Sequence, residues 1–166
     1  MVRTLMSTLP NQPVDLQAQV ENALTDFCAV AKLAQIIFTR DDLAVELLPA
    51  PHKAPTRLPA DKVAVYAFFV GGVSLKVGKA GPNSQARYTS QHYNAGSAPS
   101  TLAASIMRRP SVFGLEMVDT KAVGTLIKAR ADRVNILLPS SFGDAPLSLL
   151  EAFLHCRWKP VFEGRG

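Results

Sequence analysis

The chain has 166 residues and a formal net charge of +5; 48% of its residues are hydrophobic and 19% are charged. This length fits one domain with an appendage, and the composition is that of a globular chain rather than a disordered one. No apolar run reaches the roughly 18 to 20 residues of a membrane helix, and the first residues lack the apolar core of a secretory signal. Because Cys28 and Cys156 have no metal-like spacing, we expect reduced thiols in a cytoplasmic protein that has no membrane partner.

The positive charge is concentrated after residue 60. Residues 1–60 carry a net charge of −1, and the remaining residues carry +6. No carboxylate occurs between Asp61 and Glu116, whereas this segment contains six basic side chains, Lys62, Lys76, Lys79, Arg87, Arg108 and Arg109. Such an acid-free segment indicates a surface for a polyanion such as nucleic acid. Charge alone does not distinguish that surface from an ordinary solvated basic face.

The N-terminal part of the chain reads as helical. Residues 1–13 show no periodicity and are expected to form a loose tail. From Val14 to about Phe38 apolar residues recur at three- and four-residue steps, which predicts an amphipathic helix. Short extended segments are predicted within 36–47, and the prolines of residues 49–59 indicate an extended linker. We therefore predict an N-terminal helical appendage and linker over 1–61 and the main domain over 62–166.

The main domain begins with a predicted β-hairpin. Val63–Val70 is rich in β-branched and aromatic residues, Gly71-Gly72 is a two-residue turn signal, and Val73–Val77 alternates as a second strand. The later predicted elements are a helix from Pro82 to about Tyr93, a helix over 100–107, a strand over 112–118, a helix over 120–131, a strand over 134–138 and a helix from about Ala145 to Trp158. The fold class is thus α/β of the α+β kind: a small antiparallel β-sheet flanked by helices, with a helical N-terminal appendage.

Two polar side chains in the hairpin do not fit a purely structural strand. Tyr66 alone would be read as a half-buried strand tyrosine, but Lys76 interrupts an apolar strand. A tight turn at Gly71-Gly72 places Tyr66 opposite Val77, with Lys76 one position out of register. A bulge or a longer turn would instead put Lys76 on the same face as Tyr66. Both arrangements stay open at this point.

The helices contribute three further candidates. Glu151 borders the apolar stripe of the last helix, so its carboxylate needs a partner: a metal, a cation or a hydrogen-bond donor. A salt-bridged glutamate at the margin of the stripe is the alternative. Arg87 lies in the acid-free segment and has no local carboxylate. On a continuous helix Gln91 would lie about 40° from Arg87 and His92 about 140° from it, so His92 is expected to point elsewhere.

The sequence resembles the GIY-YIG nuclease superfamily in the order of four motif residues, Tyr66, Lys76, Arg87 and Glu151. Members of this superfamily are built on a small antiparallel sheet flanked by helices. The resemblance covers about residues 62–164. Ala64-Val65 departs from the first motif, and Lys76 replaces the usual tyrosine of the second, as in some restriction enzymes of the superfamily. Lys159–Phe162 is similar to the close of the last motif.

The final motif of the superfamily often ends in asparagine, and Glu163 stands there instead. The family often has a histidine or tyrosine one turn after the arginine. Gln91 occupies that position here and His92 is displaced from it by one.

The resemblance implies a set of catalytic roles. Glu151 would bind one Mg²⁺ or Mn²⁺ ion, and Arg87 would contact the phosphate. Tyr66 would position or deprotonate the attacking water with help from Lys76, because a tyrosine of ordinary pKa, about 10, is a poor base without a neighbouring cation. His92 is a reserve general base or acid.

The predicted function is that of a metal-dependent endonuclease acting on DNA, with RNA as the second candidate polymer. Lys79, Arg108 and Arg109 are the predicted nucleic-acid-binding residues. The alternative is a catalytically inactive nucleic-acid-binding module of the same fold. A small-molecule enzyme is disfavoured because the sequence has no cofactor fingerprint. If cleavage is specific for a symmetric site, a homodimer is expected.

Overall fold

The computed structural model describes residues 15–162, and the tail predicted over 1–13 lies outside them. An α+β fold is observed, as the sequence predicts: one four-stranded antiparallel sheet in the order β1-β4-β2-β3, flanked by helices. The strands are β1 (Ala44–Leu48), β2 (Lys62–Val70), β3 (Val73–Ala80) and β4 (Asp132–Pro139). The α-helices are α1 (Leu16–Leu33), α2 (Gln85–Thr89), α3 (Leu102–Arg108), α4 (Val123–Arg130) and α5 (Asp144–Trp158). Within 15–162, none of the helices has the length and apolarity needed to cross a membrane.

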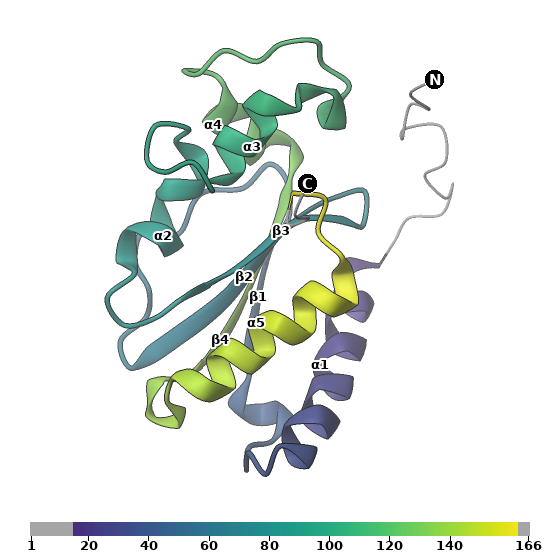
Figure 1. Ribbon diagram of the computed structural model, residues 1–166, viewed down its shortest axis with the longest axis vertical. Coiled ribbons are helices and arrows are strands. Elements are labelled where there is room, and N and C mark those ends of the chain that lie inside the picture. Colours follow the sequence, from purple (N-terminus) through teal and green to yellow (C-terminus); the bar gives the residue numbers. More distant parts are fainter. Residues whose placement is uncertain (1–14, 163–166) are drawn as a thin grey trace.

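The sheet separates two helical layers, each with its own apolar core (Figure 1). Helices α1 and α5 cover one face, where Phe27 and Leu150 are fully buried. Helices α2, α3 and α4 cover the other face, where Phe68 and Ile106 are fully buried. Because strand residues alternate between the faces, β2 supplies both cores and is buried from Val63 to Phe69.

The segment before residue 62 contributes to the same sheet and core as the rest of the chain. Helix α1 begins at Leu16, and the Asp15 side chain caps it by accepting a hydrogen bond from the backbone N–H of Ala18 at 3.1 Å. Its buried face packs with α5. Strand β1 pairs antiparallel with β4, and Ala44 lies opposite Leu137. The sheet, and the core between it and helices α1 and α5, therefore contain residues from both predicted parts of the chain.

The hairpin contains the bulge that the sequence left open. Gly71 and Gly72 both have positive φ (56° and 77°), the conformation that a tight two-residue turn requires. The register then shifts between Phe68 and Phe69. As a result Phe68 lies opposite Lys76 rather than Leu75, and Tyr66 lies opposite Gly78 rather than Val77. Directly opposed residues share a face, so Lys76 lies on the Tyr66 face of the sheet.

Helix α1 ends at Leu33 rather than near Phe38, and two other predicted elements differ more from the structure. The helix predicted from Pro82 to Tyr93 is shorter: α2 ends at Thr89, and a separate 3₁₀ turn, η3 (Gln91–Tyr93), follows. The strand predicted over 112–118 is wrong. Pro110 instead begins the 3₁₀ turn η4 (Pro110–Phe113), which ends at Gly114 in the left-handed conformation (φ 70°). The apolar residues that suggested a strand belong instead to an irregular loop. One of them, Phe113, is buried in the core beneath helices α2, α3 and α4.

The contact between α4 and η3 can be tested at Gly124. A Cβ atom there would lie 2.5 Å from the backbone oxygen of Tyr93. In an exposed helix a Gly→Ala change would raise the free energy of unfolding by about 1 kcal/mol, but here we expect Gly124→Ala to lower it. The matched control is Gly81→Ala, because a Cβ at Gly81 would meet nothing within 4 Å. Urea unfolding of both variants gives the comparison; a stabilised Gly124→Ala protein would contradict this packing.

Candidate active site

A hydrogen bond between Tyr66 and His92 lies at the centre of the candidate site. The Tyr66 hydroxyl oxygen is 2.6 Å from Nε2 of His92, and the two rings are tilted against each other with centroids 4.8 Å apart. Nδ1 of His92 accepts a hydrogen bond from the backbone N–H of Leu102 at 3.2 Å. Tyr66 is 1% exposed and His92 5% exposed, so both polar groups depend on protein partners.

His92 reaches Tyr66 because α2 ends early. On a continuous helix the side chain would point away from the Arg87 face, as the sequence analysis expects. The turn η3 changes the direction of the chain after Thr89, and His92 turns inward while Gln91 stays at the surface margin. The structure therefore brings His92, and not Gln91, to the tyrosine.

The surroundings of His92 keep its imidazole neutral. Burial, followed by the positive charges of Lys76, Arg133 and Arg87, lowers the pKa of His92 to about 3. These cations come from β3, β4 and α2, so the predicted site residues Lys76 and Arg87 contribute to one electrostatic cluster with Tyr66 and His92. Lys76 is 7% exposed, whereas Arg87 is exposed to solvent. Arg87 is thus placed to meet an anion arriving from outside.

Gly78 makes room for the tyrosine. It lies opposite Tyr66 in the β2–β3 pairing, and a Cβ atom at this position would be 2.5 Å from the Tyr66 hydroxyl oxygen. No larger side chain fits there unless the tyrosine moves. The position of Tyr66 therefore requires a glycine at residue 78.

The sequence analysis missed Arg133, a fully buried cation on β4. Its guanidinium donates hydrogen bonds to the Tyr88 carbonyl oxygen at 2.5 Å, to the Tyr93 hydroxyl at 3.1 Å and to the Asn135 side-chain oxygen at 2.8 Å. It also lies 5.1 to 5.9 Å from the centres of four aromatic rings, those of Tyr66, Phe68, Tyr88 and Tyr93. The alternation of Arg133 and Asn135 in an otherwise apolar strand was the available signal.

Arg133 fixes both ends of the segment that carries His92. Tyr88 lies in α2 and Tyr93 ends η3, and both are bonded to the same guanidinium. A chain of hydrogen bonds continues from Asn135 to the carboxylate of Glu46, which also accepts from the Tyr88 hydroxyl at 3.2 Å. The negative charge of Glu46 is therefore connected to Arg133 through neutral groups, and Arg133 is a positioning residue for the site.

Glu151 lies on α5, in the layer that covers the opposite face of the sheet. Its side chain is 26% exposed, and one carboxylate oxygen is 3.8 Å from the Lys79 ammonium. Lys79 also lies 4.0 Å from the carboxylate of Asp144 and donates a hydrogen bond to the Ser148 hydroxyl at 2.6 Å. In this structure the predicted nucleic-acid-binding lysine is thus a partner of the predicted metal ligand.

The residues around Glu151 fit an open Mg²⁺ or Mn²⁺ site better than a closed one. Across residues 15–162, no group of three or more His, Cys, Asp or Glu side chains is arranged to hold a metal ion. Mg²⁺ is commonly held by one or two carboxylates, with water and substrate phosphate completing its shell. Glu151 supplies one partly exposed carboxylate, and the Lys79 ammonium lies 3.8 Å from it, so a metal ion held there would have to displace this lysine.

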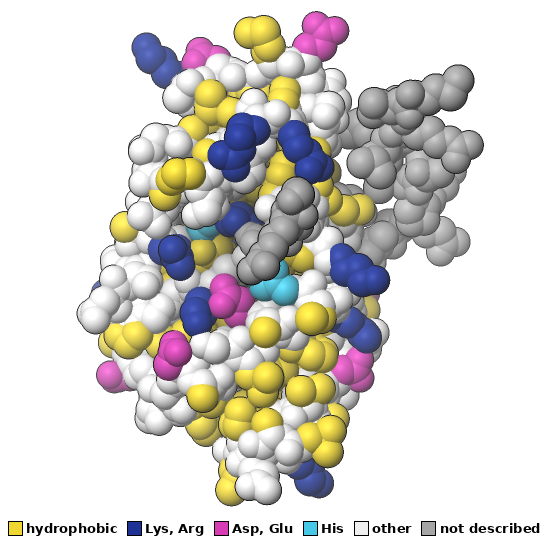
Figure 2. Space-filling model, viewed as in Figure 1, with side chains coloured by type: hydrophobic (Ala, Val, Ile, Leu, Met, Phe, Trp, Pro, Cys, Tyr) yellow, Lys and Arg dark blue, Asp and Glu magenta, His cyan; other side chains and the backbone are white. Residues whose placement is uncertain are grey.

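Arg108 and Arg109 lie apart from the Tyr66–His92 pair, where α3 ends. Together with Ser105, Val161 and Phe162 they line a hollow of about 140 Å³. The Arg109 guanidinium lies over the Phe162 ring at 5.5 Å, and the Phe162 backbone N–H bonds to the Leu75 carbonyl beside Lys76. Figure 2 shows Lys and Arg side chains gathered across the middle of this face, between α3 and α5. Glu163 lies outside the described residues.

The neutral state of His92 should make the folded protein less stable in mild acid. Its pKa is about 3 in the folded chain and near 6.5 in an unfolded one. Only the unfolded chain takes up this proton between those values, so stability is full above about pH 6.5 and falls as the pH drops toward 3. From pH 7 to 5 we expect wild type to lose roughly 2 kcal/mol more than His92→Gln in urea unfolding. Parallel pH curves for the two proteins would contradict this.

Comparison with known proteins does not identify the chain. No protein-family model, characterised protein or solved structure matches it. The resemblance to GIY-YIG nucleases therefore rests on the motif residues of the sequence alone and stays a prediction.

Proposed function

We propose that the protein is a divalent-metal-dependent endonuclease that hydrolyses phosphodiester bonds in DNA. The observation that carries this proposal is the Tyr66–His92 hydrogen bond, with the charges of Lys76, Arg87 and Arg133 around it. All three charged groups that shift the pKa of His92 are cations. A reactive oxygen in such positive surroundings suits an anionic substrate, because the cations favour both phosphate binding and a phenolate.

The chain's own groups can be given roles in the hydrolysis. After Tyr66 has lost its proton to solvent, its phenolate oxygen takes a proton from a water molecule as the water oxygen bonds to phosphorus. The phosphorus–oxygen bond to the departing nucleotide then breaks, and that oxygen takes a proton from solvent. Lys76 stabilises the phenolate, and Arg87 binds the phosphoryl oxygens. A divalent ion held by Glu151 would polarise the phosphate and stabilise the leaving oxygen.

A second candidate function is a nucleic-acid-binding module without turnover. Two observations favour it: Tyr66 is only 1% exposed, and the Glu151 carboxylate already has Lys79 as a cationic partner. Both functions require a basic surface that binds nucleic acid; the surface at the end of α3 that contains Arg108 and Arg109 is called the basic face here. They differ in whether Tyr66 and Glu151 are needed for a reaction.

Cleavage of supercoiled plasmid in Mg²⁺ or Mn²⁺ separates the two functions. We expect nicked or linear product with wild-type protein, none with chelator, and a loss of at least about a hundredfold in Tyr66→Phe and Glu151→Ala, since each removes a chemical role. Glu116→Ala is the matched carboxylate control, because Glu116 is exposed in the loop before α4. DNA retention on a gel without any cutting by wild type would instead establish the binding module.

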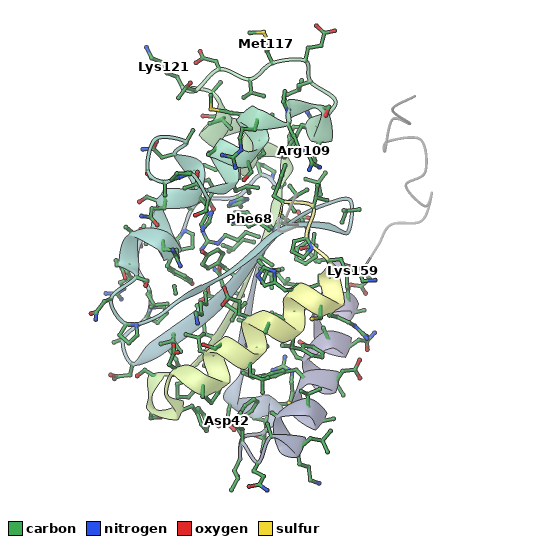
Figure 3. All side chains as sticks on the ribbon, viewed as in Figure 1. Asp42, Phe68, Arg109, Met117, Lys121 and Lys159 are labelled. Carbon is green, nitrogen blue, oxygen red and sulfur yellow. The ribbon has the colours of Figure 1, made fainter. Side chains whose placement is uncertain are left out.

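The basic face should give salt-dependent binding. Arg109 lies at the end of α3, whereas Lys121 lies at the tip of the molecule, in the loop before α4 and on the side away from α5 (Figure 3). In chelator, we expect Arg109→Gln to weaken binding to duplex DNA and to reduce the slope of log K against log salt by about 1, as for one lost phosphate contact. Lys121→Gln removes the same charge and should leave the slope unchanged. Fluorescence anisotropy across a salt series measures both; equal slopes for the two variants would exclude Arg109 from the interface.

A further inference from the structure

The hydrogen bonds of His92 determine which ring nitrogen carries its proton. Nδ1 accepts a hydrogen bond from the Leu102 backbone N–H, so this nitrogen has no hydrogen of its own. A neutral imidazole carries one hydrogen, which must then lie on Nε2. That atom is the one 2.6 Å from the Tyr66 hydroxyl oxygen.

We infer that His92 donates a hydrogen bond from Nε2 to the Tyr66 oxygen, and that it is a positioning residue for this tyrosine rather than a general base. The catalytic consequence rests on the proposed function, whereas the direction of the hydrogen bond rests on geometry alone. A donor to the tyrosine oxygen stabilises the phenolate more than the phenol, because hydrogen bonds to charged acceptors are stronger. The tyrosine's own hydrogen then points away from His92.

The groups around His92 oppose the reverse arrangement. If Tyr66 donated to Nε2, the hydrogen of the imidazole would move to Nδ1 and would face the Leu102 N–H across 3.2 Å. If both nitrogens were protonated, the same clash would occur next to three positive charges, those of Lys76 on β3, Arg133 on β4 and Arg87 on α2. The imidazole is therefore poorly placed to receive a proton from the tyrosine.

The other buried histidine, His52, has hydrogen-bond partners that require the opposite tautomer. Its Nδ1 lies 2.8 Å from the Ala131 carbonyl oxygen, which can only accept, so Nδ1 carries the hydrogen. Its Nε2 then accepts from the Tyr93 hydroxyl at 2.8 Å. The two buried histidines are thus expected to hold opposite tautomers within one protein.

Nitrogen-15 NMR of the full chain tests the direction of the hydrogen bond. The protein has three histidines, so His92→Gln and His155→Gln variants suffice to assign the ring signals. At pH 7 we expect Nε2 of His92 to be protonated and its Nδ1 unprotonated, with the reverse pattern for His52. The His92 pattern should persist to pH 5. A proton on Nδ1 of His92, or protonation of both nitrogens by pH 5, would overturn the inference.

A pair of His92 variants tests the role. Glutamine can donate an N–H near the position of Nε2 but cannot take up a proton, whereas leucine can do neither. We expect His92→Leu to raise the pH at which Tyr66 ionises by about 1 unit or more and to slow plasmid cleavage about a hundredfold, the effect of one hydrogen bond to a charged group. His92→Gln should stay within about tenfold of wild type in cleavage and should leave the Tyr66 ionisation nearly unchanged.

The tyrosine titration keeps the inference separate from the proposed function. The chain has three tyrosines, and carbon-13 labelling of their rings, with Tyr66→Phe for assignment, follows Tyr66 without any cleavage assay. If wild type cuts no DNA, the proposed function fails and the titration alone decides the inference. Equal effects of His92→Gln and His92→Leu on the Tyr66 ionisation, in folded proteins, would show that donation from His92 has no role.

Discussion

The buried charge of Arg133 is the constraint on which the candidate site depends. A guanidinium removed from water must be solvated by protein groups, and here these are the Tyr88 carbonyl, the Tyr93 hydroxyl, the Asn135 amide and the surrounding aromatic rings. Removing one such hydrogen-bond partner from a buried group typically costs about 1–3 kcal/mol, and more where the group is charged. The segment from α2 to η3 is therefore bound to β4 at both ends, and the position of His92 follows from that attachment rather than from a local helix.

The absence of carboxylates between Asp61 and Glu116 affects the charge around His92 in the folded chain. His92 lies in this segment, and the charges that shift its pKa come from Lys76, Arg133 and Arg87. A carboxylate next to the imidazole would favour its protonated form and would oppose an approaching phosphate. The same acid-free composition thus supports the neutral His92 tautomer and an anion-attracting surface. In the Arg133 network, Asn135 connects the guanidinium to the negative charge of Glu46 by hydrogen bonds.

The sequence predicts the elements of this fold better than the contacts between them. The hairpin, the last helix and the strand containing Val134 follow from periodicity and turn residues, which are local properties. The prediction of a strand over 112–118 is wrong because these apolar residues lie in a loop between Pro110 and helix α4 and reach the core from there. The neighbours of Tyr66 depended on a bulge that sequence allows but does not require. The inward turn of His92 depended on where α2 stops, and the stop is maintained by tertiary bonds to Arg133.

Strand β3 connects the two halves of the candidate site. Successive strand residues point to opposite faces, so Gly78 faces Tyr66 while its neighbour Lys79 faces α5 and pairs with Glu151. The tyrosine pair and the predicted metal ligand therefore lie in different helical layers and meet through adjacent residues of one strand. The C-terminal residues Val161 and Phe162 bond to the same strand just before Lys76. Under the proposed function, a nucleic acid that contacts both Arg87 and Glu151 would have to lie across the edge strand β3.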